Sequence, residues 1–210
     1  MLLYVASTNP GKLRDFAAAA AGSSFEIAPL PDLDSLEPPA EDGVTFVANA
    51  AAKAIFYSLA RPGLPVMADD SGLEIDALTG GPGVRSARYA DDQHYVTKRP
   101  LPLDQRNNLC VLDALATTRD GERQAHFRCA LAVARDGKVV AEAEGSVHGE
   151  ILAIPRGSGG FGYDPLFLLP DLGVTMAELG AVQKLEFSHR GRALKALQAK
   201  LDTIANIAQT

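Results

Sequence analysis

Apolar runs separated by turn formers predict a chain in which strands and helices alternate. Residues 2–6 form a short apolar run that is typical of a buried strand, and residues 25–28 predict a second strand. Residues 12–21 have a strong helix propensity, and residues 44–60 predict a second helix, which a Pro-Gly pair closes. Residues 29–43 are rich in proline and acids and predict a loop. The chain therefore opens as a strand, a polar loop and a helix.

The second half of the chain contains a predicted long hairpin. Residues 124–135 and 138–152 are β-like runs on either side of Asp136-Gly137, a pair that favours a type I′ turn. Residues 103–117 predict a helix before the hairpin, and a C-terminal helix is predicted from about residue 188 to about residue 207. Strand–helix alternation around a hairpin predicts an α/β fold with a mixed, twisted central sheet and flanking helices.

The stretch "VMADDSGLEID" (residues 66–76) places two acids at the end of an apolar run. Residues 65–68 predict a strand, and Asp69 and Asp70 follow it directly, ahead of Ser71. Two like charges at the end of a buried strand are costly unless positive groups meet them. Successive side chains of a strand point to opposite faces, so a strand that continues this far gives the two acids different tasks.

The composition is that of an ordinary soluble globular protein with one sizeable domain: 210 residues, 47% hydrophobic and 22% charged. The net charge of −6 argues against a general nucleic-acid or membrane-surface binder, which needs a basic patch. The most apolar long window, residues 44–60, is too short and too polar to span a bilayer. Cys110 and Cys129 lack metal-ligand spacing and are interpreted as reduced, packed thiols. Because the sequence shows no signal-peptide pattern, we expect a cytoplasmic protein.

Three segments carry residues suited to an anionic or planar ligand. "STNPGK" (residues 7–12) opens a helix, where backbone N–H groups and a lysine favour phosphate, although an ordinary strand–turn–helix connection fits equally well. "SHRGR" (residues 188–192) places positive charge in a first helical turn, which indicates either a nearby anion or acceptor, or a solvated basic end. "GSGGFGYD" (residues 157–164) combines glycines that permit close approach with aromatic rings that stack, or forms a structural turn.

Lys53 is the only charged residue in residues 44–60, and Asn49 lies on the same helical face. The face is either a solvated stripe or partly covered, in which case Asp69, Asp70 or a bound phosphate must neutralise the lysine. Together the segments supply the parts for binding a nucleoside triphosphate: lysines and a glycine loop for phosphates, carboxylates for Mg²⁺ and an aromatic ring for the base. No Ser–His–Asp elbow, HExxH motif or metal-spaced Cys/His cluster competes with this interpretation.

These motifs, in this order, resemble the inosine triphosphate pyrophosphatase family, and the resemblance spans nearly the whole chain. The matching segments are Ser7-x-Asn9-x-x-Lys12, Glu41-x-Gly43-x-Thr45-Phe46 with Asn49-Ala50 and Lys53, "ADDSGLEIDALTGGPGVRSARYA" (residues 68–90), "GGFGYDPLF" (residues 159–167) and Lys184-x-x-x-Ser188-His189-Arg190-Gly191. Residues 91–108 depart from the pattern, because they are longer and richer in proline than the usual connection into the next helix.

The resemblance implies a fold with two lobes around a substrate cleft, a homodimer, and Mg²⁺-dependent cleavage of deaminated purine nucleoside triphosphates. The substrates would be ITP, dITP and XTP, and the products the monophosphate and pyrophosphate, so that deaminated bases stay out of DNA and RNA. Asp70 would be the catalytic base, Glu41 and Asp70 the metal ligands, and Asp69 a support behind the site. The implied substrate-binding residues are Ser7, Thr8, Asn9, Pro10, Gly11, Lys12 and Lys53 for the phosphates, Ser71, and Phe161, Gly162, Tyr163, Asp164, Lys184, His189 and Arg190 for the purine.

The implied base contacts agree with hydrogen-bond chemistry. Lysine, arginine and a suitably protonated histidine donate hydrogen bonds, so they suit the 6-oxo acceptor of hypoxanthine or xanthine and disfavour the 6-amino group of adenine. Guanine also carries a 6-oxo group, so its rejection needs another cause, such as steric exclusion of the 2-amino group. Two alternatives remain: a Maf-like pyrophosphatase that prefers modified pyrimidine or other nucleotides, and a protein that binds its nucleotide without hydrolysing it.

Overall fold

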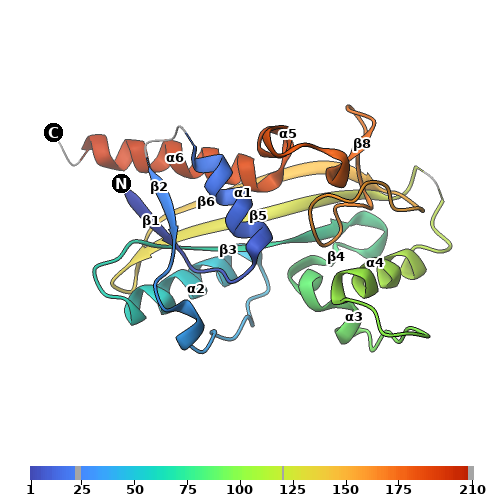
Figure 1. The fold of residues 1–210 in the computed structure, drawn as a ribbon, viewed down its shortest axis with the longest axis horizontal. Coiled ribbons are helices and arrows are strands. Elements are labelled where there is room, and N and C mark those ends of the chain that lie inside the picture. The colour runs from blue at the N-terminus through green and yellow to red at the C-terminus, as the bar shows by residue number, and fades with distance from the viewer. Residues whose placement is uncertain (22–24, 120, 208–210) are drawn as a thin grey trace. The chain divides into compact units, whose positions relative to one another are not determined.

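The computed structural model describes residues 1–21, 25–119 and 121–207. The described strands form a mixed, open sheet in the order β2-β1-β3-β5-β6-β7-β8, with β4 paired to β3 (Figure 1). β1 pairs in parallel with β2 and β3, whereas β3–β4, β6–β7 and β7–β8 are antiparallel pairs. The α/β class with a mixed central sheet is thus confirmed.

The strands and helices have the following bounds. The strands are β1 Leu2–Val5, β2 Glu26–Pro29, β3 Val66–Ile75, β4 Gly81–Pro82, β5 Gln124–Arg135, β6 Lys138–Ile151, β7 Phe167–Leu169 and β8 Val174–Thr175. The α-helices are α1 Pro10–Ala20, α2 Phe46–Ala60, α3 Tyr89–Asp92, α4 Leu103–Ala114, α5 Ala181–Phe187 and α6 His189–Ile207. Short 3₁₀ helices lie at Leu33–Ser35, Asp76–Leu78, Gly83–Arg88 and Met176–Glu178.

The chain divides into two compact units. The first comprises Met1–Asp70, Cys129–Ser146 and Leu185–Thr210, and the second comprises Ser71–Arg128 and Val147–Lys184. Each of the strands β3, β5 and β6 contributes residues to both units.

In the first unit, α1 and α6 lie side by side over one face of the sheet, and α2 lies on the other side (Figure 1). The core under α1 and α6 is built from side chains of these two helices and of β1, β3, β5 and β6, together with Phe25 just before β2. Its buried members are Leu3, Val5, Phe16, Ala20, Phe25, Met67, Cys129, Leu131, Val133, Ala141, Ala143, Ala193, Leu194, Leu197 and Leu201. Met67 of β3 belongs to this core, so the odd-numbered side chains of β3 near it face α1 and α6.

The hairpin of β5 and β6 forms where the sequence predicts it. Asp136 and Gly137 have φ angles of 52° and 78°, as a type I′ turn requires. The turn is fixed to the end of α2: the Gly63 N–H donates to Asp136 Oδ1 at 2.7 Å, and the Gly137 N–H donates to Ser58 Oγ at 2.9 Å. The turn is therefore anchored at both of its residues.

Several element boundaries differ from the predicted ones. α1 begins two residues early because Pro10 fits the first helical position, and α4 ends at Ala114 instead of residue 117. β3 continues through both acids to Ile75, well beyond the apolar run. The short elements β7, β8 and α5 were not predicted, because runs of two to seven residues carry too little periodicity to be recognised.

Both cysteines are buried free thiols, as predicted. No helix among the described residues is long and apolar enough to cross a membrane.

Candidate active site

The segment between β1 and α1 carries most of the predicted phosphate-binding residues, and its geometry is set by Asn9. The Asn9 Oδ1 accepts hydrogen bonds from the Gly11 N–H at 2.8 Å and the Lys12 N–H at 3.1 Å. Pro10 has no N–H, so the first-turn donors that the sequence offers to phosphate are already used by this cap. A phosphate at this segment would have to contact the side chains of Ser7, Thr8, Asn9 and Lys12 instead.

Asp69 holds the ammonium group of Lys12. Its Oδ2 lies 2.8 Å from Lys12 Nζ, and its side chain is only 3% exposed. Burial opposes ionisation of this carboxyl group, but the charges of Lys12, Lys53 and Arg190 outweigh it and lower the pKa of Asp69. At neutral pH, Asp69 is therefore a charged anchor for a lysine of α1.

Asp70 contacts a different helix. Its Oδ2 accepts a hydrogen bond from Asn49 Nδ2 at 2.8 Å, and its Oδ1 lies 3.7 Å from Lys53 Nζ; both partners are on α2. Burial raises the pKa of Asp70, and Lys53 and Asn49 offset that effect only in part. The carboxyl group of Asp70 is therefore protonated more easily than that of the neighbouring Asp69.

The different partners of the two acids follow from the alternation of side chains along β3. Asp69 shares the face of Met67, where α1 and α6 pack, whereas Asp70 faces α2. The prediction that the two acids have different tasks is therefore consistent with their contacts.

Asn49 ties Asp70 to the loop that carries Glu41. Its Oδ1 accepts the Gly43 N–H at 2.8 Å, so its amide must present Nδ2 to Asp70. A side chain at position 43 would collide with Asn49 Oδ1, so only glycine fits there without displacing the amide. Asn49 was noted in the sequence on the same helical face as Lys53, but the role of Gly43 depends on a fold contact that no local pattern reveals.

Glu41 and Asp70 share Lys53 as a partner. The Lys53 Nζ donates to Glu41 Oε1 at 2.5 Å, and the two carboxylates together with Asp69 raise the pKa of Lys53 against the effect of its burial. Among the described residues, no group of three or more His, Cys, Asp or Glu side chains could hold a metal ion. A pair of carboxylates still fits Mg²⁺, which typically takes one or two carboxylates and completes its shell with phosphate oxygens and water.

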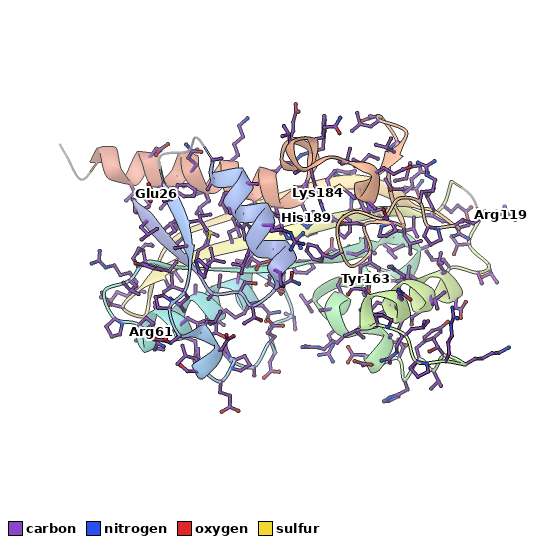
Figure 2. The ribbon with its side chains drawn as sticks, viewed as in Figure 1. Glu26, Arg61, Arg119, Tyr163, Lys184 and His189 are labelled. Carbon is purple, nitrogen blue, oxygen red and sulfur yellow. The ribbon has the colours of Figure 1, made fainter. Side chains whose placement is uncertain are left out.

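At the start of α6, the predicted base-contacting residues His189 and Arg190 are both buried. Ser188 caps the helix, because its Oγ accepts the Gly191 N–H at 3.1 Å. Figure 2 labels His189, the first residue of this helix. Arg190 Nη1 lies 3.3 Å from Asp15 Oδ2 of α1. The basic start of the helix predicted a nearby anion, and for Arg190 the carboxylate of Asp15 is that anion.

In the second unit, Phe161 and Lys184 both contact Asp164. Asp164 Oδ2 accepts the Phe161 N–H at 3.0 Å and lies 2.6 Å from Lys184 Nζ. Lys184 Nζ also lies 5.4 Å from the centre of the Phe161 ring. Asp164 thus fixes both the aromatic residue and the lysine that the sequence assigned to the purine.

Tyr163 has a structural contact within the same unit. Its hydroxyl donates to the Ser86 carbonyl at 2.8 Å, and burial raises its pKa (Tyr163 and Lys184 are labelled in Figure 2). Ser71 follows Asp70 directly on β3 and is half-buried. The predicted site residues therefore belong to both units: the carboxylate–lysine group lies in the first, and the contacts of Phe161, Asp164 and Lys184 lie in the second, to which Ser71 also belongs.

Comparison with known proteins agrees with this arrangement of motifs. The model of the Ham1 family matches residues 3–200. The chain is similar to a dITP/XTP pyrophosphatase of Acidobacterium capsulatum, with 55% identity over 96% of this chain and 98% of that protein. It is also similar to a dITP/XTP pyrophosphatase of Thermus thermophilus, with 43% identity over 94% of this chain and 90% of that protein.

Among solved structures, the fold is similar to that of a HAM1 protein from Coxiella burnetii, with a TM-score of 0.80 and 37% identity. That match covers 97% of this chain and 99% of the Coxiella chain. The Ham1 protein of Staphylococcus aureus gives a TM-score of 0.78 and 36% identity, over 97% and 99% of the two chains. With a family model that spans almost the entire chain and relatives this close, the chain belongs to the Ham1 family.

Proposed function

We propose that this chain is a nucleoside triphosphate pyrophosphatase that hydrolyses ITP, dITP and XTP to the monophosphate and pyrophosphate. The observation that carries the proposal is Asp70, a buried carboxylate that Asn49 orients beside Lys53. The relatives from Acidobacterium capsulatum and Thermus thermophilus are named dITP/XTP pyrophosphatase, which supports this proposal. The biological role would be to keep deaminated purines out of DNA and RNA.

The lysines would offset the charge of the triphosphate. Lys12 and Lys53 carry full positive charges, and each is already oriented by a carboxylate, Asp69 or Glu41. Preorganised charges of this kind stabilise the negative charge that builds up on phosphate oxygens in the transition state. Ser7, Thr8 and the Asn9 amide group would add hydrogen bonds to the phosphates.

Asp70 would act as the general base. In the protein without metal, burial raises the pKa of Asp70, so its carboxylate is a stronger proton acceptor there than an exposed aspartate. The carboxylate would take a proton from water while the water oxygen bonds to the α-phosphorus. The bond between the α-phosphorus and the oxygen that bridges the α- and β-phosphates would break, and pyrophosphate would leave with that oxygen.

We infer that Mg²⁺ is the cofactor and that Glu41 and Asp70 would hold it. When bound, Mg²⁺ would neutralise phosphate charge and polarise the phosphoryl group. Glu41 can serve as the second carboxylate because it is partly exposed and its partner Lys53 has a long side chain that can move aside.

The purine would stack on Phe161, with Lys184, His189 and Arg190 directed to its 6-oxo edge. Lys184 and Arg190 each have an acidic partner, yet lysine has three N–H donors and arginine five, so donors remain for the base. Adenine would place a donor against these donors and be rejected. We further propose a cytoplasmic homodimer, with no nucleic acid or membrane partner, in keeping with the net charge of −6.

A pyrophosphate-release assay tests the proposal. With Mg²⁺, the purified protein should release pyrophosphate from dITP, ITP and XTP much faster than from dATP, dGTP or UTP. Equal rates on all nucleotides would contradict the specificity, and a preference for UTP would favour a Maf-like activity. Tight ITP binding without pyrophosphate release would show a binding protein, and Asp70→Asn should abolish release while ITP binding stays measurable.

A further inference from the structure

The peptide groups of Gly162, next to the Phe161 ring, are held from both sides by one helix. The Gly162 N–H donates to Asp104 Oδ2 at 2.8 Å, and Asn108 Nδ2 donates to the Gly162 carbonyl at 3.1 Å. Asp104 and Asn108 are four residues apart and therefore lie on the same face of α4, one helical turn apart. Both backbone polar groups of a single residue thus depend on two side chains that are distant in sequence.

The side of Gly162 on which a side chain would stand is open. A Cβ atom there would meet no atom within 4 Å other than those of its chain neighbours, so the contacts that hold the Gly162 peptide groups are the two hydrogen bonds from α4. Gly162 also has a φ of 61°, in the left-handed region. Phe161 is held through its N–H to Asp164 and through the contact of its ring with Lys184, and the two Gly162 bonds add to the set that orients the ring.

We infer that Asp104 and Asn108 are positioning residues for purine recognition, acting through the backbone of Gly162. This inference rests on the proposed function, in which Phe161 stacks on the base. Holding the ring in its binding orientation before the nucleotide arrives lowers the entropy lost on binding, so it strengthens binding without adding a contact to the ligand. α4 would then set the affinity for the purine although it does not touch it.

The two positions make opposite chemical demands. Position 104 must accept a hydrogen bond from an N–H, whereas position 108 must donate one to a carbonyl. Asp104→Asn keeps an acceptor oxygen, and it should restore most of what Asp104→Ala loses. Asn108→Asp has the same shape as asparagine but turns a donor into a carboxylate that repels the Gly162 carbonyl, so it should behave like Asn108→Ala.

The chain contains no tryptophan, so Phe161→Trp introduces a single indole at the ring in question, which can be excited selectively over the five tyrosines. In this background, without nucleotide, Asn108→Asp and Asp104→Ala should lower the fluorescence anisotropy of the introduced indole, because the ring gains freedom. ITP titrations in EDTA, followed by the quenching of the same fluorophore, should show binding weakened about threefold to tenfold, as expected for the loss of one hydrogen bond.

In the chain with Phe161 intact, the loss should fall on KM more than on kcat, because neither residue is placed at the phosphates. Gln105→Ala is the matched control: it removes an exposed polar side chain of the same helical turn and should change neither anisotropy nor affinity. A merely structural role would lower the melting temperature of Asn108→Asp without changing the anisotropy of the folded protein.

The inference is wrong if Asn108→Asp matches Gln105→Ala in anisotropy and ITP affinity while folded. If either alanine variant fails to fold, the isosteric pair Asp104→Asn and Asn108→Asp still decides the question. Failure of the proposed function looks different, because the unmodified chain would then release no pyrophosphate from dITP, whatever the anisotropies show.

Discussion

At the scale of single residues, the two adjacent acids of β3 show how environment divides one chemical group into two roles. Asp69 meets Lys12 and stays charged, whereas Asp70 is buried with only partial compensation. Adjacent positions on a strand reach opposite faces, so this difference needs no change in backbone conformation. The pKa values of the two carboxyl groups are shifted in opposite directions for this reason.

Replacing each acid by asparagine should therefore change the free energy of unfolding differently. Asp69→Asn breaks a buried ion pair and should lower the free energy of unfolding at pH 7 by about 3 kcal/mol. Asp70→Asn removes a carboxylate whose ionisation opposes folding, so the free energy of unfolding should stay the same or rise, although activity is lost. Urea denaturation of both variants at pH 7 measures the difference, and equal destabilisation by both would contradict it.

The pH dependence of this effect has a definite sign. The pKa of folded Asp69 lies below its ordinary value of 3.8, so its contribution to stability is complete above that value. The contribution is lost as the pH falls from there through the folded pKa. The urea midpoint of the parent protein should therefore fall more steeply below about pH 4 than that of Asp69→Asn.

At the scale of elements, the start of α1 combines capping with the predicted phosphate segment. Asn9 Oδ1 occupies the N-terminal donors of the helix, and under the proposed function the amide N–H groups of the same side chain would donate to phosphate. Replacing Asn9 should therefore change both the stability of the protein and its affinity for the nucleotide.

Asn9→Ala should lower the free energy of unfolding by about 1 kcal/mol, the usual worth of such a cap. It should also weaken ITP binding, because the amide group is lost. Asn9→Asp separates the two effects: the cap remains, so thermal stability should be retained, while a negative charge beside the phosphates weakens ITP binding. Thermal unfolding and equilibrium ITP binding of the two variants check this, and a fall in the stability of Asn9→Asp as large as that of Asn9→Ala would contradict it.

The sequence predicts those elements that carry a strong local signal. The hairpin around Asp136 and Gly137 and the α2 helix are examples, because turn chemistry and periodicity are written in neighbouring residues. The short strands β7 and β8 lack such a signal, since they exist only through pairing with other strands. The pairing of Arg190 with Asp15, which are 175 positions apart, could not be derived from spacing for the same reason.

At the scale of the whole molecule, the contacts that orient the predicted site residues join distant parts of the chain within each unit. The sequence supplies the acids, the lysines and the aromatic loop, but not the partners that orient them, such as Gly43 for Asn49 or Asp104 for Gly162. These partners are backbone groups or side chains far away in the sequence, whose contacts are decided by the fold. Residue types could therefore be predicted, and their orientation could not.

The metal requirement also belongs to this scale. Glu41 and Asp70 both lie beside Lys53, so the protein alone should bind Mg²⁺ weakly and hold it well only together with nucleotide phosphates. Calorimetric titration with and without a non-hydrolysable ITP analogue measures this. EDTA should stop pyrophosphate release while leaving the melting temperature unchanged; a large fall in melting temperature would indicate a structural metal instead.

The alternation of side chains along β3 also constrains how this stretch of chain can change in length. Removing or inserting one residue just before Asp69 would turn each acid toward the helix that now serves its neighbour. A deletion would bring Asp70 to the place where Asp69 now meets Lys12, and an insertion would bring Asp69 to the place where Asp70 now meets Asn49 and Lys53. Substitutions within the strand can be graded in severity, but a change of one residue in its length turns both acids to the opposite faces at once.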